Sequence, residues 1–477
     1  MKSTIRISDC AMKTLAFAAA AISLWAVWFF CYPYFLRWLE GFNFFSPLPD
    51  FSALNLDLPG KAFRYIASFL LQFFATPAAG AAIMALLPLT VILSAWCSIN
   101  RLFNEADSLL WLAFLPLPFA VNAQMGDITL VPSVTWAVIS VLAALAVLMV
   151  TIFVKVRIPV PGFLCRKWLN PVIIAIILCT SAFTVWNGEQ NRRYEELTSL
   201  EYHADHHEWD KILEEVSRTD AIRNDYKRRY LLLALSEKGM LADHAFTYGL
   251  SGSGDFIFSD VKDPLQQNFN MAFFSRLGLA NPVVYHAYQQ SLQSVIGLTS
   301  RSLRYLADTY LEIGDYGLAK KHMDILDRSG CNRRWLESRK PLLESIRNSE
   351  PAYNTDGEKF PWGQFLQDMK NLSERHPQNR KYADYMLCSL LADRHGFEFY
   401  DAFQKLAPVL YSERIPAIYQ QALLMFISQK PEELEKYKID ESIMAGFMEY
   451  TDMLRTGRDS QARSKYAGTY WAYLTRR

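Results

Sequence analysis

Charged side chains are scarce in the first 188 residues of this 477-residue sequence. That stretch contains 11 of the 49 lysine and arginine residues and 7 of the 48 aspartate and glutamate residues. The net charge of +1 therefore averages a charge-poor segment with a charge-rich one, residues 189–477. This asymmetry excludes a single soluble domain and a disordered chain, and the lack of a basic excess excludes a nucleic-acid partner held by a strong positive field.

Cysteines and catalytic motifs are also sparse. Only Cys331 and Cys388 follow residue 188, and there is no CxxC, so we expect buried thiols rather than a disulfide framework. The sequence has no Walker A motif, GxSxG, HExxH or kinase signature, and no GxGxxG after a strand. We therefore assign no catalytic residue, metal or cofactor, and favour a protein that is not an enzyme.

Long uncharged runs predict membrane-spanning helices, since about 20 apolar residues cross the hydrocarbon core. The run after Lys13 ends in aromatic residues rather than at a small-residue cleavage site, so we interpret it as an uncleaved anchor rather than a signal peptide. The predicted spans are residues 14–36, 78–98, 108–126, 128–154 and 168–188.

The 36 uncharged residues between Arg64 and Arg101 need a break, because one helix of that length would measure about 54 Å. Pro77 disfavours helix at Thr76. We expect an interfacial or re-entrant helix at residues 62–75 and a single span at 78–98. The alternative is two spans, which would place all later loops and the C-terminal half on the opposite side of the membrane.

Lysine and arginine in short loops predict the orientation. With five spans, one side receives eight of them, from the N-terminus, Arg101 and residues 155–167, and the other side receives three, Arg37, Lys61 and Arg64. The richer side is predicted to be cytoplasmic. Residues 189–477 would then form a soluble domain in a periplasmic or extracellular space, separate from the membrane domain, residues 1–188.

In the polar half, residues 189–477, apolar residues recur at three- and four-residue spacing, which predicts helices throughout. The predicted fold class is therefore all-α. The segment SLRYLADTYLEIGDYGLAKKHMDIL resembles a tetratricopeptide repeat, a helix–turn–helix unit of about 34 residues. Gly314 and Asp315 are predicted to form its turn. Its apolar core positions are Leu303, Leu306, Ala307, Tyr310, Ala319, Met323 and Leu326.

Weaker helix pairs are expected on both sides of this unit, in residues 199–246 and 381–437. The resemblance to tetratricopeptide repeats covers residues 195–437. It implies an α-solenoid, which offers an extended concave surface for a peptide or protein. By this resemblance the first helix of the clear unit would line the groove. The candidate binding residues are Arg301, Arg304, Asp308 and Glu312.

Two interruptions divide the polar half. Residues 250–282 hold several phenylalanines, predicted either to pack on their own domain or to contact the membrane half or a partner. Residues 350–362 are predicted to be a surface connector. The histidines and carboxylates at residues 203–210 are interpreted as a solvated turn between helices, although His203 and His207 have a spacing compatible with metal ligation.

The order of parts resembles an uncharacterised family of bacterial multi-spanning membrane proteins with a tetratricopeptide-like tail. The segments that carry the resemblance are FRYIASFLLQFFATPAAGAAIMALL, HHEWDKILEEV and LLLALSEKGMLADHAF. It implies an integral protein of the bacterial inner membrane and no assigned activity.

The leading hypothesis is a membrane scaffold whose exported helical domain binds a protein or peptide at the cell envelope. The alternative is a membrane enzyme acting on a lipid-linked or glycan substrate, with Asp50 and Asp57 in its first outer loop. In that case the helical repeats would recruit the acceptor.

Overall fold

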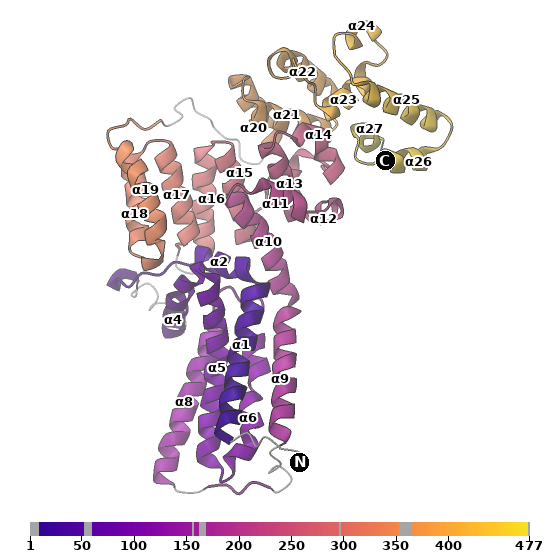
Figure 1. Cartoon of the computed structure of the whole chain (residues 1–477). Helices are drawn as coiled ribbons and strands as arrows, with labels where there is room; N and C mark the ends of the chain where they lie inside the picture. The colour runs from indigo at the N-terminus through magenta and orange to yellow at the C-terminus, as the bar shows by residue number, and fades with distance from the viewer. Residues whose placement is uncertain are drawn as a thin grey trace, which may run out of the picture. The chain divides into compact units, whose positions relative to one another are not determined.

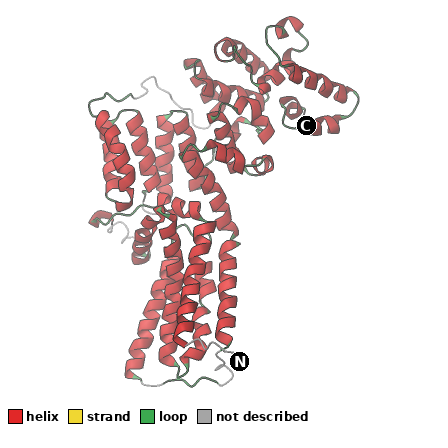
Figure 2. Cartoon of the chain, in the orientation of Figure 1, coloured by secondary structure: helices red, strands yellow, loops and turns green. Residues whose placement is uncertain are grey.

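The computed structural model describes residues 9–51, 60–154, 157–161, 168–294, 297–352 and 364–475. Within these ranges the chain is built of helices and loops (Figure 2), and strand pairing is limited to one isolated bridge between Phe103 and Ile158. The predicted all-α class is confirmed. The chain divides into two compact units, residues 1–199 with 290–350 and residues 200–289 with 351–477. The clear helix–turn–helix segment thus belongs to the same unit as the apolar helices.

The first unit combines the apolar half of the chain with the segment around residue 300 (Figure 1). Two helices pass from one unit to the other, α10 (Glu189–Asp205) and α16 (Ala280–Gln293). The remaining helices of the first unit are α1 (Asp9–Cys31), α2 (Pro33–Phe42), α4 (Lys61–Leu71), η1 (Gln72–Ala75), α5 (Pro77–Leu102), η2 (Ala106–Leu109), α6 (Leu110–Phe114), α7 (Leu117–Asn122), α8 (Val131–Phe153), α9 (Leu169–Trp186), α17 (Ser300–Glu312), α18 (Tyr316–Asp327), η5 (Gly330–Asn332) and α19 (Arg333–Ser345).

Four of the described helices are long and apolar enough to cross a membrane: Cys10–Cys31, Pro77–Leu102, Val131–Phe153 and Leu169–Trp186. They correspond to four of the five predicted spans and pack side by side (Figure 1). The outer surface of α8 is largely exposed and apolar. A face of this kind is expected where lipid tails, rather than water, surround a helix.

Helices α1 and α5 are antiparallel neighbours. Trp25, near the end of α1, donates from its indole nitrogen to the carbonyl of Ala78 at the start of α5 (3.1 Å). At the opposite end, the ammonium of Lys13 lies 5.2 Å from the ring centroid of Trp96. Residues 32–76 therefore begin and end at the same end of the bundle, so the run between Arg64 and Arg101 contributes one long helix rather than two.

The break at Thr76 lies where the sequence predicted it. Thr76 is extended (φ −106°, ψ 114°), and α5 begins at Pro77, whose fixed φ suits the first helical position. The preceding apolar stretch, Ala62–Ala75, is shorter than a span. Its exposed side chains include Ile66, Phe69 and Phe73 along one face. The apolar face suits contact with lipid, and the interfacial assignment remains a prediction.

The fifth predicted span, residues 108–126, is not one long helix. It is broken into η2, α6 and α7, with Pro116 capping α7, and is among the shorter apolar segments. It nevertheless runs the length of α9. At one end, Asn170 in the first turn of α9 donates to the carbonyl of Asp107 (2.8 Å), and at the other the amide of Gly126 donates to Asn191 (2.8 Å).

Gln124 explains how this segment is fixed. Pro88 lies inside α5 and has no N–H, so the carbonyl of Met84, four residues earlier, has no helical hydrogen-bond partner. The side-chain amide of Gln124, itself buried, donates to that carbonyl at 2.8 Å. A backbone carbonyl without a hydrogen-bond partner in an apolar bundle lowers stability by several kcal/mol. The pairing removes that cost.

The predicted helix–turn–helix at residues 302–326 is confirmed. Helices α17 and α18 are joined by Gly314 in a left-handed conformation (φ 78°), and the Asp315 carboxylate caps α18 by accepting from the amide of Leu318 (2.8 Å). Ala307 and Ala319 are fully buried, which permits the two helices to pack closely. The other core positions predicted for this unit are also buried: Leu303, Leu306, Tyr310, Met323 and Leu326.

The second unit is a set of shorter helices that pack mainly on their sequence neighbours. They are α11 (Trp209–Glu215), α12 (Arg218–Arg223), α13 (Asp225–Glu237), α14 (Leu241–His244), η3 (Ala245–Tyr248), η4 (Ser253–Asp255), α15 (Pro264–Arg276), α20 (Phe365–Arg375), α21 (Arg380–Ala392), α22 (Gly396–Leu410), α23 (Ala417–Ile427), α24 (Pro431–Leu434), α25 (Glu441–Arg455), α26 (Asp459–Lys465) and α27 (Tyr470–Leu474).

The phenylalanines of residues 250–282 pack inside the second unit. Phe256 and Phe273 both contact the ring of Tyr385 on α21, with centroids 5.1 and 5.2 Å apart. All five phenylalanines of this stretch are buried. The prediction that this stretch packs on its own domain is confirmed. The predicted connector at 350–362 lies, from residue 353 on, outside the described residues.

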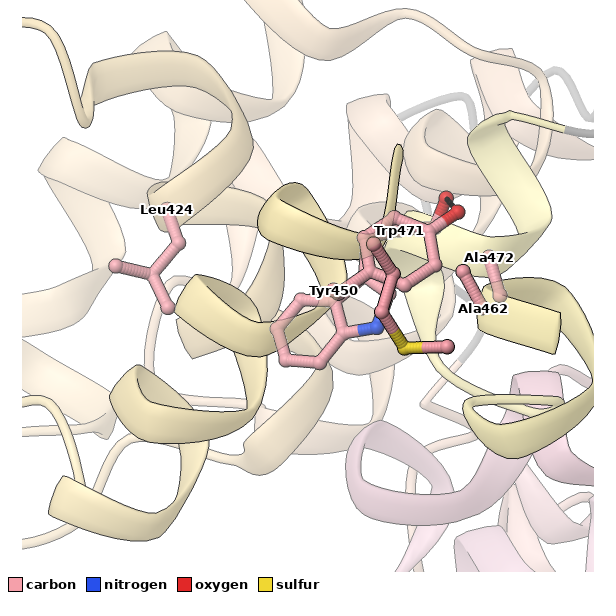
Figure 3. Close-up of a cluster of buried hydrophobic side chains, with 6 residues drawn as sticks. Leu424, Tyr450, Ala462, Trp471 and Ala472 are labelled. Carbon is pink, nitrogen blue, oxygen red and sulfur yellow. Dashed lines mark hydrogen bonds between the residues drawn. The ribbon is translucent and has the colours of Figure 1, made fainter. Parts of the chain in front are cut away.

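The C-terminal helices close over one aromatic cluster (Figure 3). Tyr450 of α25 and Trp471 of α27 stack with their ring centroids 6.0 Å apart, and both side chains are almost completely buried. The cluster consists of Leu424, Tyr450, Met453, Ala462, Trp471 and Ala472. It joins four helices, α23, α25, α26 and α27, which are too short to be stable alone.

We expect Trp471→Ala to destabilise the second unit by about 3–5 kcal/mol, because it removes a large buried side chain and leaves a cavity. Met448→Ala is the matched control on α25, where the side chain is 62% exposed, and should change stability by no more than about 0.5 kcal/mol. Thermal unfolding and protease resistance of the full chain would measure both. Equal stability of the two variants would contradict this packing.

Candidate functional site

The four residues predicted to line a groove lie on α17, and the structure places two of them against α2. The Arg304 guanidinium donates to the Glu40 carboxylate at 2.7 Å and to the side-chain oxygen of Asn332 at 2.6 and 3.0 Å. Arg301 packs beside Gly41, where an added Cβ would lie 3.4 Å from its Nε. This face of α17 is therefore joined to the segment that follows α1.

Glu40 is the residue that sequence reasoning missed. Only 5% of its surface is exposed, although it is charged. A buried carboxylate is costly unless it is paired, and Arg304 supplies the pairing. Ser300 adds to the contact between α17 and the segment that follows α1, because its amide and hydroxyl both donate to the carbonyl of Asn43 (3.0 and 2.7 Å). The sequence feature that could have indicated this role is that Glu40 is a single acidic residue in an otherwise apolar and aromatic stretch.

The other two predicted groove residues are Asp308 and Glu312. Arg339 of α19 donates to both carboxylate oxygens of Asp308, at 3.0 and 3.2 Å. Glu312 is exposed at the end of α17. Arg301 and Arg304 contact α2, and a binding role for the four residues remains a prediction.

The histidine-rich segment forms a turn, as expected. Helix α10 ends at Asp205, His207 adopts a left-handed conformation (φ 58°), and α11 begins at Trp209. His203 is held by the Glu208 carboxylate at 2.6 Å. Among the described residues, no group of three or more possible ligands is arranged to hold a metal ion. Of the two loop aspartates, Asp50 is exposed, and Asp57 lies outside the described residues.

The second unit contains a cleft of about 720 Å³, which we call the unit-2 cleft. It opens between the end of α22 and the turns at residues 412–416 and 436–440. Its volume is in the range of about 300–1,000 Å³ that is typical of ligand sites. The lining residues are Gln404, Ala407, Pro408, Tyr411, Ser412, Glu413, Arg414, Ile415, Gln420, Lys436, Tyr437, Lys438 and Asp440.

A buried glutamine fixes the two turns that form the cleft. The Gln420 amide nitrogen donates to the carbonyl of Ile415 (2.7 Å) and to the Asp440 carboxylate (2.9 Å). The Asp440 backbone amide donates back to the Gln420 side-chain oxygen at 2.7 Å. Because these hydrogen bonds span both turns, the cleft has a rigid polar floor.

One wall rests on a buried carboxylate. The hydroxyls of Tyr411 and Tyr419 both donate to one oxygen of Asp384, at 2.7 and 2.8 Å, and Arg380 donates to the other at 3.3 Å. Burial raises the pKa of the Asp384 carboxyl, although these three donors oppose the shift. Burial also raises the pKa of the neighbouring Cys388 thiol, which is free. The network holds the Tyr411 ring in place at the cleft wall.

The rim of the cleft carries charges of both signs. Lys436, Lys438 and Glu413 are exposed, and their side chains make no hydrogen bond or ion pair within the described part of the chain. Arg414 is different, because it pairs with Asp243 of α14 at 3.0 Å and anchors its turn. A rigid polar floor with unpaired charges at the rim can hold an extended polar ligand through ion pairs and hydrogen bonds.

The sequence profile of the Family of unknown function (DUF6057) matches residues 8–186 and 128–477. The chain belongs to this family. No curated protein and no solved structure matches it. Membership in DUF6057 agrees with the resemblance to an uncharacterised family and assigns no activity.

Charge reversal tests the Glu40–Arg304 pair. We expect Glu40→Arg and Arg304→Glu each to destabilise the first unit, at the lower end of about 3–5 kcal/mol because Arg304 is 26% exposed. The double reversal should recover part of the loss. Thermal unfolding of the four proteins in detergent gives the coupling free energy.

The matched control is Glu344→Arg, which breaks the exposed ion pair with Arg347 and should cost less than about 1 kcal/mol. Additive effects of the two reversals, with no recovery in the double variant, would show that Glu40 and Arg304 do not interact.

Proposed function

We propose that this protein is an integral membrane scaffold whose second helical unit binds an extended protein or peptide segment at the bacterial cell envelope. The unit-2 cleft carries the proposal, because it combines a rigid floor with unpaired charges at its rim. The helix pairs of the tail support it as well, since tetratricopeptide-like repeats present concave binding surfaces. We include such a repeat architecture in the proposal.

The proposed orientation places the N-terminus in the cytoplasm and residues after 188 in a periplasmic or extracellular space. It is supported by the contacts at the ends of the bundle. Lys13 pairs with Asp107 at 2.6 Å, and the amide of Asn104 donates to the carbonyl of Ile158, so three basic segments meet at one end. The rule that basic loops stay inside then assigns that end to the cytoplasm.

The opposite end of the bundle joins the termini of α1 and α9. The hydroxyl of Tyr32 donates to the carbonyl of Val185 at 2.5 Å, and the Glu195 carboxylate accepts from the amides of Tyr34 and Phe35 (3.2 and 2.8 Å). The carboxylate thereby caps α2, whose first amides have no helical partner. Residues 32–43 and 188–199 therefore lie on one side of the proposed membrane.

Photocrosslinking tests the binding proposal. A photoreactive phenylalanine analogue at Ser412 or Lys438, on the rim of the unit-2 cleft, should give a discrete adduct in intact cells. The same analogue at Phe397 or Met448, exposed positions that do not line the cleft, should not. Lys436→Glu should reduce the Lys438 adduct severalfold, because it removes a charge beside the bound segment. Equal adducts at all four positions would contradict a binding cleft.

Reporter fusions test the orientation. Alkaline phosphatase should be active when fused after Phe45 or Leu200, and a cytoplasmic fluorescent reporter should be active after Asn104. Each reporter serves as the control for the other. A fluorescent reporter that is active after Leu200 would mean an even number of crossings before that residue and would overturn the proposed orientation.

A further inference from the structure

A second, smaller pocket lies at the end of the bundle where α1 begins. Its volume is about 340 Å³, and it is formed by the turn between α5 and α6 together with the segment after α8. The polar side chains that line it include Asn100, Asn104, Glu105, Asp107 and Arg157. It belongs entirely to the first unit and is independent of the unit-2 cleft.

The pocket is fixed by contacts from three different segments. Asp107 accepts an ion pair from Lys13 of α1 (2.6 Å), and its carbonyl accepts from the fully buried Asn170 of α9 (2.8 Å). The amide of Ile158 donates to the carbonyl of Leu102 at 2.8 Å. The last contact holds Arg157 beside the turn, so the pocket is assembled without a ligand.

Several polar side chains in this pocket are available to bind a ligand. Asn100, Asn104, Glu105 and Arg157 are exposed, and the structure gives their side chains no hydrogen-bond or ion-pair partner among the residues it describes. Asp107, by contrast, is already neutralised by Lys13. The pocket therefore offers one guanidinium and two amides as donors, and one carboxylate as an acceptor.

Exposed apolar side chains flank the pocket. Phe153 is 80% exposed and Val154 52% exposed at the end of α8, and Ile158 is 46% exposed beside Arg157. They continue the apolar surface of α8, one of the four helices long enough to cross a membrane. A polar pocket at the end of such a surface matches a molecule with a polar head and apolar chains.

We propose that this pocket binds the headgroup of a phospholipid that carries both a phosphate and a primary ammonium, as an ethanolamine headgroup does. Arg157 and the two asparagine amides hold the phosphate, because guanidinium and amide donors match its oxygens. Glu105 accepts hydrogen bonds from the ammonium. The acyl chains lie along the exposed apolar surface of α8.

The chemistry sets a clear order among lipids. A glycerol headgroup has a net negative charge and no ammonium, so Glu105 disfavours it. A choline headgroup carries a positive charge but has no N–H to donate to Glu105, so it binds more weakly than ethanolamine. Inorganic phosphate offers the same oxygens to Arg157 but lacks both the ammonium and the chains.

Lipid titration of the full-length protein, delipidated in detergent and followed by native mass spectrometry, tests the proposal. Phosphatidylethanolamine should bind more tightly than phosphatidylcholine or phosphatidylglycerol of the same chain length. Arg157→Gln should weaken its binding about tenfold, the loss expected for one charge-assisted contact. Glu105→Gln should remove the preference for ethanolamine over glycerol, a change that general loss of folding would not produce.

Arg101→Gln is the matched control, since Arg101 is exposed in the last turn of α5 and does not line the pocket. It should bind phosphatidylethanolamine as the unmodified protein does. An equal loss in Arg101→Gln and Arg157→Gln would overturn the proposal in favour of unspecific charge attraction. Competition by inorganic phosphate at lipid concentrations would overturn it in favour of a free-phosphate site.

Discussion

The buried carboxylate of Glu40 is the constraint on which one end of the first unit depends. An unpaired charge at this position would cost several kcal/mol, so α2 is stable there only while Arg304 is in contact with it. The pair also orients Arg304 toward Asn332, which precedes α19. Helices α17 to α19 are thereby attached to the segment following α1, and they belong to the unit that contains the four long apolar helices.

Asp384 in the second unit is likewise a buried carboxylate that has to be satisfied by hydrogen-bond donors. It too is buried, and three donors from α21, α23 and the end of α22 converge on it. Since an unsatisfied carboxylate would be expelled or protonated, the helices that carry these donors are held in one arrangement. The unit-2 cleft lies against this network through Tyr411. Buried charge therefore specifies local structure in both units, and in the second unit it does so beside the cleft that we propose for binding.

Much of the fold could be predicted from the sequence, because the relevant signals are local. Uncharged runs and the proline at residue 77 indicated four long helices and the break before α5, and apolar spacing with Gly314 indicated the α17–α18 pair. The predicted span at 108–126 differs because its prolines divide it into short helices. Gln124, in this segment, donates to the Met84 carbonyl of α5, a contact over 40 residues that no local pattern encodes.

The candidate sites were predicted less well, since they depend on which surfaces meet. The resemblance to a tetratricopeptide repeat assigned Arg304 to a groove-lining face of α17, but it could not indicate that Glu40, 264 residues away, contacts Arg304. The unit-2 cleft gave no sequence signal, because it arises where two turns converge through Gln420. The histidines near residue 205, whose spacing is compatible with metal ligation, instead lie at the turn between α10 and α11.

The distribution of charge within the bundle narrows where function can reside. The charged residues of α1 and α5 lie only at their outer turns, and α8 and α9 have none. Ionisable groups inside membrane helices mark the paths of transported ions and substrates, because they are too costly to retain otherwise. The polar contacts within this bundle instead complete its backbone, as Gln124 does at Met84. This pattern supports the anchoring role that we propose for the bundle, in which binding takes place at its ends and in the second unit.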